Sequence, residues 1–136
     1  MRSEYTEENE AIPPDFGKNK EEVLLLQMVG LGRDNFMKKA ARKNYEGPYE
    51  VVKPNVDIDE AYPDKVKYRW IFDHDLGTSY STKGIHNSAI HSNNYKRYYV
   101  YDRLNDKKYS SGAEFTYYAQ GLKIYMEVLN NKRNGI

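Results

Sequence analysis

The apolar positions of this chain fall in short runs that are separated by polar segments containing Pro or Gly. The first run, 23–29, follows Asn19 and Glu22, whose spacing is that of a helix capping pair, and Gly30 comes directly after it. A second apolar stripe, with a basic face opposite it, occupies residues 34–43. The pattern therefore predicts two short helices, one that begins near Asn19 and one over residues 34–43.

The pattern changes after the second helix. Residues 44–64 contain three prolines and no helical period, which predicts an extended connector. Three segments favour strands by their alternation or β-prone residues: 66–72, 96–101 and 114–118. Asn105 and Asp106 predict a turn, and the polar segment 73–95 is expected to be a long insertion loop. Apolar residues at helical spacing over 122–131 predict a terminal helix.

Together these elements predict an α+β fold. An N-terminal arm and two short helices are followed by a small antiparallel β-barrel or sandwich and a C-terminal helix. We expect three segments along the chain: an extended acidic arm over 1–18, a helical segment with its Pro-containing connector over 19–64, and a small β domain with the insertion loop and a C-terminal extension over 65–136.

Length and charge narrow the classes of protein that fit. The chain has 136 residues, with 21 basic and 20 acidic side chains and no Cys. A disulfide framework, a thiolate nucleophile and a Cys-type zinc site are therefore excluded. The balanced charge argues against a general polyanion binder. The longest apolar run, 23–26, is far shorter than the roughly 20 residues that span a bilayer. The acidic start has the pattern of neither a transit peptide nor a secretory signal, so we expect that none is needed or that a presequence has been removed.

Tyrosine is unusually frequent, with 14 Tyr beside 4 Phe and 1 Trp. Tyr has an apolar ring and a polar tip that needs a partner when it is buried. Two interpretations remain open. The rings either lie on the strand faces of a β-rich domain, or they form surfaces that dock onto partner proteins.

Candidate catalytic chemistry is sparse. His74, His86 and His91, with Asp73 or Asp75, have the ligand types of a metal site and leave open a small metal-dependent hydrolase. The chain has no P-loop, no dinucleotide-binding glycine motif and no nucleophile elbow. We therefore expect no catalytic residue and no cofactor.

Two further classes stay open. The segment Lys96–Tyr101 mixes bases with aromatic rings, as in proteins that stack nucleobases on a sheet, so a mitochondrial ribosomal or other RNA-contacting protein is one alternative. A host-interaction or inhibitor protein without an active site is another.

The order of three features resembles a known family. Residues 12–15 read Ile-Pro-Pro-Asp, the predicted acidic helix follows, and residues 32–36 read Gly-Arg-Asp-Asn-Phe. This order is similar to subunit Vb of mitochondrial cytochrome c oxidase (subunit IV in fungi), which has a Val-Pro-Thr-Asp-type motif, an acidic helix, a Gly-x-Asp-x-aromatic turn, a Pro-containing connector and a small zinc-binding β-barrel.

The zinc ligands of that family are missing here. The Cys-x-Cys motif falls at Trp70 and Phe72, and the Cys-x-x-Cys motif falls at Lys108 and Ser111. The resemblance thus implies a divergent member that has lost its zinc. We hypothesise that the rings of Trp70 and Phe72 fill the former site.

The resemblance also implies a function. The chain would be an accessory, non-catalytic subunit of the oxidase (respiratory complex IV), stabilising the electron-transport complex on the matrix side of the mitochondrial inner membrane. It would be peripheral rather than transmembrane, without bound nucleic acid, and its partners would be the other subunits around the membrane-embedded core. The residues expected at the partner interface are Ile12, Pro13, Asp15, Phe36, Tyr98, Tyr99 and Tyr101.

Overall fold

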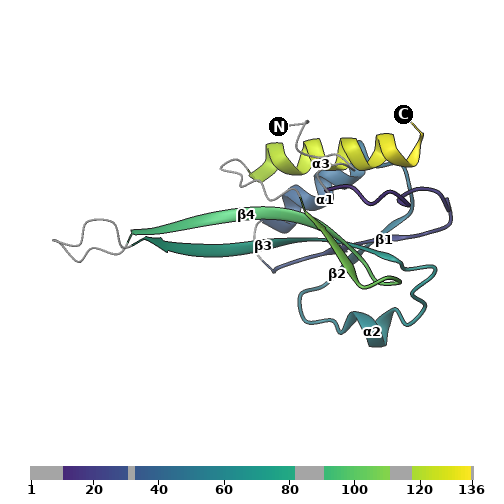
Figure 1. Ribbon diagram of the computed structural model, residues 1–136, viewed down its shortest axis with the longest axis horizontal. Coiled ribbons are helices and arrows are strands. Elements are labelled where there is room, and N and C mark those ends of the chain that lie inside the picture. Colours follow the sequence, from purple (N-terminus) through teal and green to yellow (C-terminus); the bar gives the residue numbers. More distant parts are fainter. Residues whose placement is uncertain (1–10, 31–32, 82–90, 111–117, 136) are drawn as a thin grey trace.

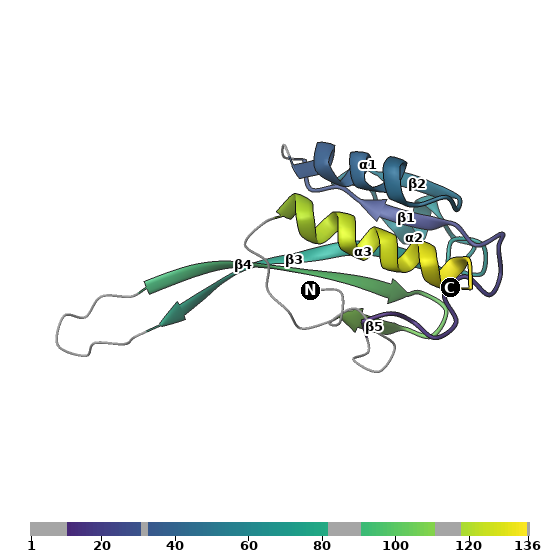
Figure 2. The same cartoon turned by 90° about the horizontal axis from the view of Figure 1, so that it is seen from above.

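Five strands form one open, mixed sheet with two helices on one face and a shorter helix on the other side (Figure 1, Figure 2). The computed structural model describes residues 11–30, 33–81, 91–110 and 118–135. The strands are β1 (Leu24–Gln27), β2 (Tyr49–Val52), β3 (Trp70–Ser81), β4 (His91–Asp102) and β5 (Lys107–Ser110), and the helices are α1 (Arg33–Asn44), α2 (Ile58–Ala61) and α3 (Tyr118–Arg133). The predicted α+β class and the terminal helix are confirmed.

The strand order β2-β1-β3-β4-β5 corrects the predicted barrel. β1 pairs in parallel with β2 and β3, while β3, β4 and β5 form antiparallel pairs. β2 and β5 are edge strands, so the sheet does not close on itself. Parallel β1 and β2 need a crossover, which α1 provides. The sheet also joins strands from both sides of the expected boundary at 64/65.

The segment expected as the first helix contains a strand instead. All four residues of 23–26 are at most 7% exposed, because β1 lies between β2 and β3 and is covered on both faces. A short apolar run without alternation is typical of such a strand. The apparent capping pair is a turn, in which Asn19 Oδ1 accepts a hydrogen bond from the Glu21 amide at 3.0 Å.

The helix predicted over 34–43 is confirmed as α1, which buries Met37, Ala40 and Ala41. The connector expected over 44–64 is not wholly extended, since it contains β2 and the four-residue α2. The strand expected from residue 66 begins at Trp70, because Asp64 Oδ1 accepts hydrogen bonds from two amides of a preceding turn.

The predicted insertion loop is largely a β-hairpin. β3 continues to Ser81 and β4 begins at His91, and their residues pair in register throughout. This ribbon projects beyond the part of the sheet that the helices cover (Figure 1, Figure 2). No described helix covers it, and its sequence lacks the apolar alternation that identifies a half-buried strand. The turn at Asn105 and Asp106 is confirmed, and Asp106 has a φ of 52°. Of the strand expected over 114–118, residues 114–117 lie outside the described residues and Tyr118 begins α3.

The main core lies between the sheet and the pair α1 and α3. Its largest fully buried side chains include Phe16, Trp70, Phe72, Tyr98 and Tyr125. The supposed extended arm contributes to this core, because Ala11, Ile12 and Phe16 are at most 2% exposed. The Tyr125 hydroxyl also donates a hydrogen bond to the Ala11 carbonyl. A smaller cluster on the opposite face contains Val23, Leu25 and Val52 and packs against Ile58 of α2.

Candidate functional site

A buried ion pair joins the residue before β3 to the last residue of β4. Arg69 Nε and Nη2 each donate to one carboxylate oxygen of Asp102 at 2.9 Å. The Asp102 side chain is 1% exposed and that of Arg69 is 11% exposed. Glu22 accepts from Arg69 Nη1 at 3.4 Å and from the Trp70 indole at 3.1 Å. The Arg69 guanidinium lies 4.3 Å from the centre of the Trp70 ring. We call Glu22, Arg69, Trp70 and Asp102 the charge network.

The pKa values agree with a charged pair. The Asp102 hydrogen bonds raise the pKa of Arg69 above its usual range, against the effect of burial. Burial disfavours the Asp102 carboxylate, but hydrogen bonds from Arg69 and Asn105 outweigh it and lower the pKa of Asp102. Asp102 also accepts hydrogen bonds from the amides of Leu104 and Asn105. Its oxygens are therefore occupied by structural partners, and the network supports the fold rather than a reaction.

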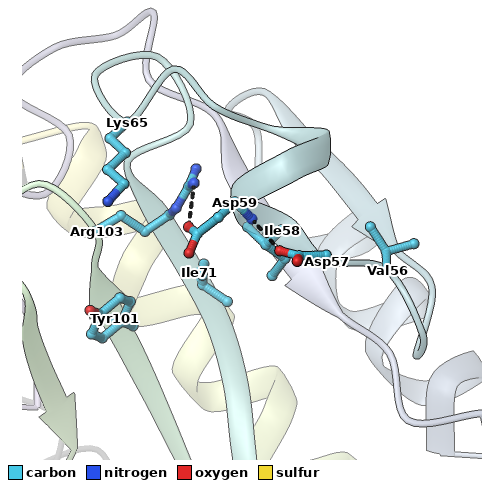
Figure 3. A pocket seen from close by; sticks show the side chains of 8 residues that line it. All are labelled: Val56, Asp57, Ile58, Asp59, Lys65, Ile71, Tyr101 and Arg103. Carbon is cyan, nitrogen blue, oxygen red and sulfur yellow. Dashed lines mark hydrogen bonds and ion pairs between the residues drawn. The ribbon is translucent and has the colours of Figure 1, made fainter.

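Arg103, the residue after β4, reaches a cavity on the α2 side of the sheet (Figure 3). The cavity has a volume of about 410 Å³, and its lining residues are Val56, Asp57, Ile58, Asp59, Lys65, Ile71, Tyr101 and Arg103. Arg103 donates to the Tyr68 carbonyl at 2.8 Å and to Asp59 Oδ1 at 3.1 Å. With its side chain 2% exposed, Arg103 is a fixed part of the wall.

The cavity does not assemble an acid–base pair. Asp57 caps α2 by accepting from the amides of Asp59 and Glu60. Asp59 is paired with Arg103, and the Tyr101 hydroxyl donates to Asp106. Among the described residues, the lining has no His, Ser or Thr.

The predicted histidine cluster does not converge. In the hairpin register, His74 is opposite Tyr98 and His91 is opposite Ser81. The two histidines are therefore seven residue pairs apart, or roughly 23 Å at a strand rise of about 3.3 Å per residue. His86 lies outside the described residues. The candidate ligand Asp73 accepts a hydrogen bond from the Tyr99 hydroxyl at 3.0 Å. Over the described ranges, no group of His, Asp and Glu side chains is arranged to hold a metal ion.

Of the four positions compared with zinc ligands, the three that the structure describes do not surround one point. Trp70 and Phe72 are buried on the sheet face that α1 and α3 cover. Lys108 is opposite Tyr101 in the register, and its ammonium lies 4.0 Å from the centre of the Tyr99 ring, on the other face. Ser111 lies outside the described residues. Trp70 and Phe72 thus belong to the main core, and no former metal site is recognisable between them and Lys108.

The structure divides the expected interface residues into two groups. Ile12, Pro13 and Tyr98 are buried within the chain, so they are not available to a partner. Asp15 and Phe36 are about half exposed, and Tyr99 and Tyr101 are partly exposed.

The Tyr residues lie both inside the core and on the opposite face of the sheet. Tyr98 and Tyr125 lie in the core, whereas Tyr99 and Tyr101 lie on the opposite face and donate to carboxylates. Those carboxylates, Asp73 and Asp106, are unfavourable neighbours for a phosphate backbone.

The glycine-containing loop after β1 is not a phosphate cradle. Asp34 of α1 accepts hydrogen bonds from the amides of Val29 and Gly30, each at 2.8 Å. A phosphate-binding loop needs such amides to be available to its ligand. The carboxylate already occupies these two donors.

Sequence reasoning missed the charge network. Its members are far apart in the chain, and neither a motif nor a spacing relates Arg69 to Asp102. The one available signal was that Arg69 and Asp102 carry opposite charges. This signal identifies a pair only when the register of β3 and β4 is known, because that register places Asp102 opposite Trp70.

Among the described residues, no helix is both long and apolar enough to cross a bilayer. Comparisons of the chain with protein-family models, with curated proteins and with solved structures find no match.

Proposed function

We propose that this chain is a non-catalytic subunit of a larger protein assembly and that it docks through the β3–β4 ribbon. We define the ribbon as residues 75–81 and 91–97, which are opposite one another in the register. The register of the ribbon carries this proposal. β1 pairs with β3 only at Trp70–Phe72, and β5 pairs with β4 only at Tyr99–Asp102. Within the described residues, the ribbon strands thus pair only with each other.

A two-stranded ribbon has little stability of its own. Two strands alone are marginally stable in water, and exposed strand edges favour pairing with other chains. The seven residues of β3 in the ribbon extend over roughly 23 Å at about 3.3 Å per residue. A partner strand at an edge of the ribbon would supply hydrogen bonds that no described strand supplies there. The engaged carboxylates of the cavity and the separated histidines are further support for a subunit without chemistry.

Shortening the ribbon tests this proposal. Replacing residues 77–95 by Asn-Gly connects Leu76 to Lys96, which are opposite each other in the register and suit a two-residue turn. Because the body of the sheet keeps its pairs, we expect the free energy of unfolding to change by less than about 1 kcal/mol. We expect the shortened variant to be absent from the large complex. Native electrophoresis of extracts from the source cells, with the chain detected by a tag, measures this.

The control is Glu50→Ala, on the exposed part of β2 away from the ribbon, which should keep the complex. The proposal is wrong if the shortened variant still enters a complex of the same size, or if the unaltered chain runs as a monomer in those extracts.

A narrower proposal is that the assembly is mitochondrial cytochrome c oxidase, with the chain on the matrix side of the inner membrane. It is supported by the order of motifs at residues 12–15 and 32–36. Two features that the family resemblance implies differ here. β1 lies where the acidic helix is expected, and the sheet is open rather than closed into a barrel. If this proposal holds, the purified complex shows the visible spectrum of a-type haem. A haem-free or ribosomal complex would overturn it and leave the broader proposal standing.

A further inference from the structure

A groove between α1 and α3 combines an apolar floor with a basic rim. Its volume is about 390 Å³, and its lining residues are Phe36, Lys39, Ala40, Lys43 and Asn44 of α1 and Lys123 of α3. The α1 residues have the spacing i, i+3, i+4, i+7 and i+8, so they share one side of the helix. Phe36 is 50% exposed, which is unusual for a ring beside an otherwise buried helix face.

The cations of this rim are poorly neutralised. Where the structure describes the chain, no carboxylate lies within ion-pair distance of Lys39 or Lys43. Lys123 is 64% exposed and reaches Glu127 only at 4.0 Å. Asn44 does not offset the charge, because its side-chain amide donates to the Ala40 carbonyl at 3.0 Å. Three ammonium groups thus surround an apolar hollow without a matching set of acids.

We propose that this groove binds an acidic peptide segment of a partner protein, with an apolar side chain of the peptide in the hollow and its carboxylates at the lysines. Three cations spread over two helices match carboxylates spaced along a chain better than they match a single small anion. A recessed apolar floor also suits an inserted side chain better than a flat membrane surface. The groove is on the helical layer, so this inference does not depend on the ribbon.

The probe is the fluorescein-labelled heptapeptide Glu-Glu-Phe-Glu-Leu-Glu-Glu, titrated with the full chain and followed by fluorescence anisotropy. We expect the double substitution Lys39→Ala, Lys43→Ala to weaken binding about tenfold, since each lost charge removes a contact to the acidic probe. Phe36→Ala should weaken it as well. Replacing the glutamates of the probe by Gln should abolish binding.

The matched control is Lys38→Ala, Arg42→Ala, which removes the same charge from the same helix but outside the groove lining. It should bind the probe as the unaltered chain does. An equal loss in both double variants would mean unspecific charge attraction and would overturn the proposal. Failure of the unaltered chain to bind the probe would overturn it too, as would binding of phosphatidylserine vesicles without binding of the peptide.

Discussion

Replacing Asp102 by Ala is expected to lower the free energy of unfolding by about 3–5 kcal/mol, the range found when one partner of a buried ion pair is removed. The reason is the charge that remains. Arg69 would stay in a site where its side chain is 11% exposed, and it would lose two hydrogen bonds of 2.9 Å. The amides of Leu104 and Asn105 would also lose an acceptor.

Urea unfolding followed by far-ultraviolet circular dichroism measures this effect. The triple variant Glu22→Gln, Arg69→Met, Asp102→Leu is the control, because it removes the three buried charges of the network together and leaves none of them unpaired, so it should recover part of the loss. If Asp102→Ala were no less stable than the unaltered chain, or if the triple variant were no more stable than Asp102→Ala, the charge network would not hold these strands.

The same pair gives the stability a dependence on pH. The pKa of Asp102 is lower in the folded chain than its ordinary value. The stabilisation is therefore complete above the unfolded pKa, about 4, and is lost as the pH falls through the lower folded value. We expect Asp102→Asn to reduce the decrease in the free energy of unfolding as the pH falls. Urea titrations from about pH 6 to about pH 2, the range in which carboxylates titrate, measure this decrease.

Gly17→Ala is expected to cost about 2–4 kcal/mol, since it combines left-handed backbone strain with overpacking. Gly17 has a φ of 81°, which an L residue adopts unfavourably. A Cβ at this position would overlap the Cα of Arg133 near the end of α3, and backbone cannot move aside as a side chain can. The turn of residues 16–17 would have to separate from α3.

Gly47 gives a matched comparison, because an added Cβ there would also meet Arg133. It would approach Nε at 2.5 Å and Cδ at 2.7 Å, which belong to a flexible side chain. Gly47→Ala should therefore lower the midpoint of thermal unfolding much less than Gly17→Ala. Equal midpoints for the two variants would show that the contact with the α3 backbone is not tight.

The two longer helices could be predicted because each has an apolar stripe of helical period that faces the core. β1 could not be recognised by the same rule. Its leucines are buried on both faces, so they form an unbroken run, and a run of this kind fits a short helix equally well. The strands of the polar ribbon were not predicted, for the opposite reason. A strand outside the layered part of the sheet needs no apolar face, so its sequence does not alternate. The predictions of β1 as a helix and of the ribbon as a loop were both wrong because the strands that pair with these segments are distant in the sequence.

The candidate site was less predictable than the fold. His74, His86 and His91 have the ligand types of a metal site, but the extended hairpin separates His74 from His91. Phe36 was expected at an interface, and it is the only residue of that expectation that lines the groove between α1 and α3. The basic face of α1 was visible in the sequence. Its division into a groove side and a solvent side depends on where α3 packs.

The position of α3 has a consequence for synthesis on the ribosome. Every strand of the sheet precedes α3 in the chain, yet α3 provides Leu122, Tyr125, Met126 and Leu129 to the layer that covers Trp70, Phe72 and Tyr98. A nascent chain that has just completed β5 therefore has a sheet whose aromatic face is only partly covered, by α1. Such surfaces attract chaperones or self-associate during translation. Docking of α3 onto the sheet thus removes this exposed aromatic face.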